Sequence, residues 1–226
     1  MDYLEEISSI VAVCRTDLDL TQTEEEPQHL HHPCIPIIIL DAVFSINAWA
    51  TVVGNVIRRY RDHAGIGDGP EQTIDDFVSL LSHMGTERFA REVLENRQRT
   101  SAQAGVLKAE AALQYALVLK DFGVNCRADL HRILDSDRFC RRIRLIPGQA
   151  ISLDYFLMMA GRIDLVKPDR MVQRFVGRCL NEPGINPPLA AYLLARAADE
   201  LRTEYNHLTP RLLDWIVWSY ERSLDE

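Results

Sequence analysis

The sequence predicts an all-α protein, and three observations lead to that prediction. Apolar side chains recur at three- to four-residue spacing through most of the chain, as on one face of an amphipathic helix. Helix-capping residues and Gly/Pro turns separate these stretches, and the only run that resembles a β-strand is residues 35–40. With 47% hydrophobic residues over 226 positions, the chain is long and apolar enough for a substantial core.

The expected helices follow in chain order. A short amphipathic helix spans residues 1–13, and a polar loop over 17–33 follows it. Residues 37–63 form a longer helix that ends before the Gly-rich breaker at 65–70. Thr73, with Asp76 three residues later, predicts a capped helix that ends near residue 84. The remaining helices cover residues 86–96, 108–122, 127–133, 137–143, 151–160, 169–180, 188–204 and 209–223, the last with Thr209 as N-cap and Pro210 after it.

Composition favours a cytoplasmic protein without a membrane partner. The five cysteines are odd in number and show no CxxC spacing, as expected of reduced thiols. The first residues lack the basic and then apolar pattern of a signal peptide. No stretch approaches the roughly 18 apolar residues that a membrane-spanning helix needs.

Charge is distributed unevenly along the chain. The net charge is −8, which argues against a generally nucleic-acid-binding surface. Residues 127–178 nevertheless hold eleven basic and six acidic residues, a net +5, which leaves −13 for the rest. We therefore expect a local basic face on an acidic body, able to attract a polyanion.

A Pro-Gly turn at residues 146–150 is the first candidate for chemistry. It joins two short predicted helices, and glycine lets a backbone approach a phosphate closely. The N–H groups that open the next helix also lie at the positive end of its dipole. Taken alone, such a turn is more commonly an ordinary connection between helices.

Asp169 is the second candidate. It follows Pro168 and begins a helix with an apolar stripe, while Arg170, Arg174 and Arg178 lie on another face. Taken alone, Asp169 is a plain N-cap. No other aspartate in the chain has this Pro-preceded, helix-opening and locally basic setting.

Together the two features resemble the helix-hairpin-helix DNA glycosylase superfamily, over about residues 37–178. Members share an LPGxG hairpin and an Asp that opens a later helix. The matching segments here are Leu145-Ile146-Pro147-Gly148 for the hairpin, Pro168-Asp169-Arg170-Met171-Val172-Gln173-Arg174 for the aspartate segment, Gly105-Val106-Leu107-Lys108-Ala109 for a Gly…Lys-Ala segment, and Phe44-Ser45-Ile46-Asn47-Ala48 for the end of a first core helix.

The resemblance implies an all-α, two-lobed helix-hairpin-helix DNA glycosylase-like fold. Residues 42–178 would form a helical lobe with the hairpin and the Asp-bearing helix. Residues 1–41 would pack with the C-terminal helices of 179–226 to complete the second lobe. The chain would thus return to the lobe in which it began.

The resemblance also implies a set of site residues. Asp169 would be the catalytic carboxylate, and Asn47 would probe the base. The DNA-binding residues would be Pro147, Gly148, Gln149, Ala150, Ser152, Arg141, Arg142, Arg144, Arg170 and Arg174. No metal site is expected, although the family often places a monovalent cation on the hairpin carbonyls.

Three departures from the family pattern qualify the expected activity. Ala150 replaces the second hairpin glycine, Ser152 stands where bifunctional members have a nucleophilic Lys, and the four-cysteine iron–sulfur pattern is missing. The resemblance therefore implies a monofunctional glycosylase without a cluster, acting on duplex DNA that carries an altered base.

Two other readings remain open at this stage. The protein is a non-catalytic relative that binds DNA or a protein partner, or it is a helical interaction protein with an accidental match. The His-rich segment with His29, His31, His32 and Cys34 has irregular spacing and favours a loop over a metal site. The three tryptophans are expected to pack in the core.

Overall fold

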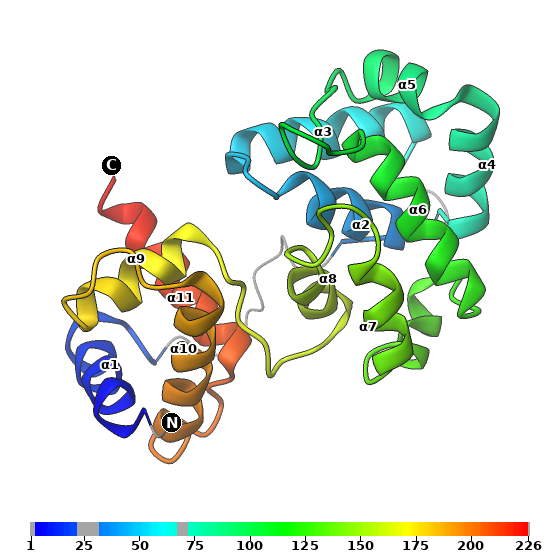
Figure 1. The fold of residues 1–226 in the computed structure, drawn as a ribbon. Helices are drawn as coiled ribbons and strands as arrows, with labels where there is room; N and C mark the ends of the chain where they lie inside the picture. The colour runs from blue at the N-terminus through cyan, green and yellow to red at the C-terminus, as the bar shows by residue number, and fades with distance from the viewer. Residues whose placement is uncertain (1–2, 22–31, 67–71, 226) are drawn as a thin grey trace. The chain divides into compact units, whose positions relative to one another are not determined.

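The computed structural model describes residues 3–21, 32–66 and 72–225, and within them the protein is all-α. No β-strand occurs there, and the one strand-like pairing is an isolated bridge between Arg99 and Leu107. The elements are α1 Leu4–Asp17, α2 Ile35–Phe44, α3 Ala50–Ala64, α4 Ile74–Met84, α5 Thr86–Arg88, the π-helical turn η2 Phe89–Val93, α6 Lys108–Asp121, the 3₁₀ helix η3 Arg127–Arg132, α7 Asp137–Arg144, α8 Leu153–Ala160, α9 Arg170–Cys179, α10 Pro187–Leu201 and α11 Pro210–Ser223 (Figure 1).

The chain divides into two compact units. The central unit is His32–Gly161, and the terminal unit joins Met1–His31 to Arg162–Glu226. The sequence had suggested a lobe over residues 42–178 instead. The boundary lies earlier because α2 packs against α3, α6 and α8, whereas α9 packs against α1, α10 and α11.

The central unit is built around α2, which is buried along its whole length. Neighbours on several sides leave no face of α2 for solvent, so its sequence is an uninterrupted apolar run (Figure 1). This explains why residues 35–40 resembled a strand: a short, fully buried helix and a buried strand have the same composition.

Two aromatic clusters complete the central core. Tyr60, Phe77 and Phe89 meet edge to face, with ring centroids 5.5 to 6.1 Å apart. Tyr115 packs on Phe139 and Phe156, which belong to the two helices that flank the Pro-Gly turn. The second cluster fixes the two helices that present the turn.

The helix expected over residues 37–63 is two helices. Residues 45–49 separate α2 from α3, and Asn47 adopts a left-handed backbone with φ 51°. Asn tolerates that region better than most residues. The expectation of one helix was wrong because side-chain periodicity continues across the break.

The terminal unit is a four-helix assembly of α1, α9, α10 and α11. Its core includes Ile10, Phe175, Leu194 and Leu213, each fully buried. Arg174 and Arg178 of α9 both pair with Glu221 of α11, a carboxylate without exposed surface. Among the described residues no helix has the length and apolarity needed to cross a membrane.

Candidate carboxylate site and nucleic-acid interface

Asp169 is the N-cap of α9, as the sequence predicted. Its Oδ1 accepts hydrogen bonds from the backbone N–H groups of Met171 at 2.8 Å and Val172 at 3.1 Å. Oδ2 makes no hydrogen bond within the part of the chain that the structure describes. The side chain is partly exposed, so one oxygen fixes the carboxylate while the other stays available.

A second carboxyl group lies beside Asp169. Asp214 of α11 accepts a hydrogen bond from the backbone N–H of Lys167, at 3.2 Å from Oδ1. Burial, and then the charge of Asp169, raise the pKa of Asp214 well above its usual range, while Lys167 acts in the opposite direction. The structure thus shows a carboxyl pair where the sequence had suggested one carboxylate.

The Pro-Gly turn joins α7 to α8 as a compact helix–turn–helix. Gly148 has φ +79°, a region that favours glycine. A Cβ built on Gly148 would lie 2.7 Å from the Cβ of Thr100, so glycine is also required for close packing. Pro147, Gly148 and Ala150 are exposed, as a backbone-binding turn requires.

Backbone donors are available on this turn. The N–H of Gln149 donates to the carbonyl of Ile146 at 3.0 Å. The N–H groups of Gly148 and Ala150 make no hydrogen bond with other described residues. Two unbonded donors in one exposed turn can bind the oxygen atoms of a phosphate.

Gln149 and Ser152, both proposed as DNA contacts, have buried side chains. The Ser152 hydroxyl is 2.6 Å from Oε1 and 3.2 Å from the carbonyl oxygen of Gln149. Their side chains stabilise the turn from inside and do not reach solvent. The buried Nε2 of Gln149 and hydroxyl of Thr100 have no hydrogen-bond partner among the described residues.

The carbonyl oxygens of the turn are the groups that would hold a monovalent cation. Those of Ile146 and Gln149 each accept one hydrogen bond within the turn. In the described ranges, no cluster of three or more His, Cys, Asp or Glu side chains is placed to hold a metal ion. His29 and His31 lie outside those ranges, while His32 pairs with Asp41 at 2.7 Å.

The predicted DNA-binding arginines differ in availability. Arg141 and Arg144 are exposed on the last turns of α7 and form no ion pair with described residues. Arg142 pairs with Asp121 at 2.8 Å. Arg170 is exposed at the start of α9.

Arg174 is already engaged within the terminal unit. It pairs with Glu221 and, at 3.0 Å, with Asp225. Glu221 has no exposed surface, so moving Arg174 to a ligand would remove one of the two cations that neutralise a buried carboxylate. Arg174 therefore acts first as a structural residue of the α9–α11 contact.

Asn47, the predicted base-probing residue, is exposed, and Lys108 binds the backbone of the residues just before it. The Lys108 ammonium donates to the carbonyls of Phe44 at 3.1 Å and Ile46 at 2.6 Å, and to Oε1 of Gln98 at 3.1 Å. Burial lowers the pKa of Lys108 to about 8. The three donors of the ammonium match the three acceptors, and together they fix the turn that presents Asn47.

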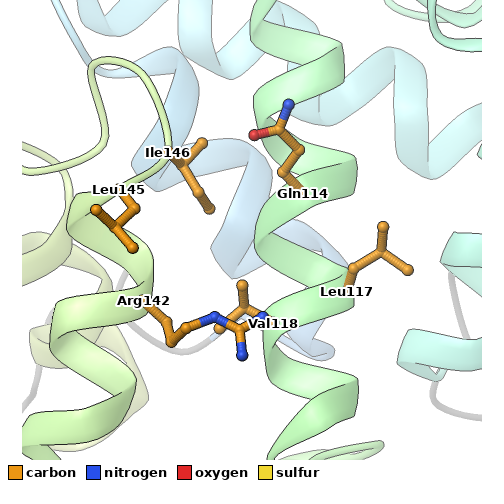
Figure 2. A pocket seen from close by; sticks show the side chains of 6 residues that line it. All are labelled: Gln114, Leu117, Val118, Arg142, Leu145 and Ile146. Atoms are coloured by element: carbon orange, nitrogen blue, oxygen red, sulfur yellow. The ribbon is translucent and has the colours of Figure 1, made fainter.

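A shallow groove of about 280 Å³ runs between α6 and the end of α7. Gln114, Leu117 and Val118 of α6 line it together with Arg142, Leu145 and Ile146 (Figure 2). Leu145 is 79% exposed, which is unusual for a large apolar side chain next to a turn. Asp169 does not line this groove.

Sequence reasoning missed Asp214 and Thr100 and misjudged the tryptophans. Asp214 interrupts the apolar sequence Leu212-Leu213-Asp214-Trp215-Ile216, which is a signal for an acid that is at least partly buried. Thr100 has no local signal. Trp49 is 67% exposed instead of packing in the core, and Trp215 and Trp218 stack on each other at 5.1 Å while partly exposed.

Comparison with known proteins identifies the family. A family model described as a domain of unknown function, DUF8548, matches residues 8–222. No curated protein and no solved structure matches the chain. Because the family match extends over nearly the whole sequence, the chain belongs to the DUF8548 family.

Proposed function

We propose that this protein is a monofunctional DNA glycosylase of the helix-hairpin-helix type, which removes an altered base from duplex DNA and leaves an abasic site. The main observation in support is the Asp169 carboxylate. One of its oxygens is fixed by hydrogen bonds at the start of α9, while the other makes no hydrogen bond with described residues. The chemistry of base release needs a fixed negative charge of this kind.

The α7–α8 turn supports the proposal. It offers two exposed backbone donors beside Arg141 and Arg144, a combination suited to a DNA backbone. The two compact units are compatible with a two-lobed glycosylase-like fold. The five cysteines are free thiols, compatible with a cytoplasmic location.

The proposed mechanism needs only this chain's residues and water. A base must leave the duplex stack before its glycosidic bond can be reached. As the bond between the sugar carbon and the base nitrogen breaks, the base takes the electron pair and positive charge develops on the sugar. The free oxygen of Asp169 stabilises that charge and accepts a proton from the water that bonds to the sugar carbon.

A lyase step is not part of the proposal. Such a step needs an amine that forms a Schiff base with the sugar. Ser152 is buried where an amine would be required, Lys108 uses its three donors internally, and Lys120 pairs with Asp75. The proposed reaction leaves the abasic site with an intact backbone.

A second candidate is a non-catalytic relative that binds DNA or a protein partner. One observation favours it: Leu145 and Leu117 expose apolar surface on the groove of Figure 2. Exposed apolar side chains around a groove are typical of interaction sites.

A base-release assay separates the two candidates. The full chain is incubated with duplexes that each carry one modified base, and abasic sites are then cleaved with alkali. The proposal expects strand cleavage after alkali on at least one duplex and none before alkali. Binding of duplexes without release on any of them would support the non-catalytic candidate and overturn the enzymatic one.

A further inference from the structure

The loop that leads into α9 is tied to α11 by one carboxyl group. Asp214 accepts a hydrogen bond from the Lys167 N–H at 3.2 Å, and the Lys167 carbonyl accepts one from the Asp169 N–H at 2.8 Å. Pro168, between them, has a fixed φ and no N–H of its own. A relay of two hydrogen bonds therefore joins Asp214 to the backbone of Asp169.

This relay restricts the orientation of the Asp169 carboxylate. The backbone N–H of Asp169 donates to the Lys167 carbonyl, and its side-chain Oδ1 accepts from the N–H groups of Met171 and Val172 in the first turn of α9. The free oxygen of Asp169 consequently has a direction set partly from α11. Catalysis by a fixed charge depends on such orientation.

The electrostatics assign different roles to the two carboxyl groups. Burial, and then the neighbouring charge of Asp169, raise the pKa of Asp214. Lys167 is the cation that opposes this shift. Among the charged groups on the neighbouring helices, Arg174 and Arg178 of α9 pair with Glu221, and Arg196 of α10 pairs with Asp199.

We propose that Asp214 is the positioning residue of the Asp169 site: its hydrogen bond with the Lys167 N–H holds the Lys167–Asp169 turn and keeps the two carboxyl groups beside each other. Its effect on base release rests on the proposed function, but its effect on the turn does not.

Carboxyl titration by ¹³C NMR tests the inference without any activity. The full-length protein is compared with the variants Asp214→Asn and Asp169→Asn. We expect one aspartate signal, missing in Asp214→Asn, to titrate well above the usual value of about 3.9. Its pKa should fall in Asp169→Asn, which keeps an N-cap and the fold. Titration of Asp214 together with the ordinary aspartates would overturn the inference.

The pH profile of base release provides the kinetic test. Wild-type release should decline on the alkaline side as Asp214 ionises beside the Asp169 carboxylate. Asp214→Asn should lack that decline because its amide does not ionise, while its oxygen can still accept from the Lys167 N–H. Asp214→Ala loses the hydrogen bond, and we expect release to fall by about tenfold at neutral pH. Thermal unfolding confirms that each variant is folded.

The two proposals fail in distinguishable ways. If wild-type protein releases no base while Asp214 titrates high, the proposed function fails and the positioning role of Asp214 stands. If wild-type protein releases a base, and folded Asp214→Ala does so at the wild-type rate and with the wild-type pH profile, the positioning role fails and the proposed function stands.

Discussion

Replacing Gly148 with alanine should destabilise the α7–α8 turn by two additive effects. A left-handed backbone costs an alanine about 1–2 kcal/mol. The new Cβ would also lie 2.7 Å from the Cβ of Thr100, and forcing an extra carbon into packed surroundings costs about 1–3 kcal/mol more. We therefore expect Gly148→Ala to lower the free energy of unfolding by about 3 kcal/mol.

Gly65 supplies a matched control. It has a left-handed backbone, with φ 63° and ψ 30°, but a Cβ there meets no atom within 4 Å. Gly65→Ala should thus lose only the backbone contribution, about 1 kcal/mol. Urea unfolding followed by circular dichroism measures both variants, and the midpoint should fall further for Gly148→Ala.

A double-mutant cycle isolates the contact with Thr100. Thr100→Gly removes the Cβ that Gly148→Ala would meet, whereas Thr100→Ala keeps it. We expect a favourable coupling of about 1–3 kcal/mol with Thr100→Gly and almost none with Thr100→Ala. Equal losses for Gly148→Ala and Gly65→Ala, without coupling, would refute the packing argument.

Three further predictions concern binding, the buried lysine and the reaction class. The double variant Arg141→Ala with Arg144→Ala should weaken duplex binding equally for all sequences and reduce the salt dependence of binding. The control pair Arg58→Ala with Arg61→Ala should change neither property. Fluorescence anisotropy over a salt series measures both. Lys108→Met should lower the free energy of unfolding by about 2–4 kcal/mol, because three oxygens lose their donor. The folded pKa of this lysine, about 8, is below its unfolded value, so wild-type stability relative to the variant should rise from about pH 8 to pH 10.5 in urea titrations. Borohydride added during a reaction on an active duplex should trap no covalent adduct, and a trapped complex would contradict the monofunctional assignment.

The local parts of the fold could be predicted from the sequence because short-range chemistry determines them. The Thr73 capping box, the Thr209 N-cap and the Asp169 N-cap all occur where they were expected. Each depends on bonds between residues two or three positions apart. Such signals can be recognised without knowledge of the tertiary contacts.

The break after α2 could not be predicted in this way. Lys108, more than 60 residues away, binds the carbonyls of Phe44 and Ile46 where the helix ends. Those carbonyls obtain a donor from another helix, which makes a break before Asn47 tolerable. The apolar periodicity of residues 37–63 does not indicate this contact.

The candidate site was predictable only in part, for the same reason. Asp169 has a local signal, but Asp214 reaches the site from α11, 47 positions beyond Lys167. Sequence position also gave no indication that Gln149 and Ser152 would face inward, or that Arg174 would be taken up by Glu221. Exposure and pairing depend on packing between distant segments.

Single-turnover base release by Asp169→Asn tests the central claim most directly. The control is Asp164→Asn, which changes an exposed aspartate of the same unit that pairs with Arg162. On a duplex that wild-type protein processes, Asp169→Asn should remain folded and bind DNA but release the base at least about a hundredfold more slowly. Asp164→Asn should release the base at the wild-type rate. Release by folded Asp169→Asn at the wild-type rate would contradict the assignment of Asp169 as the catalytic carboxylate.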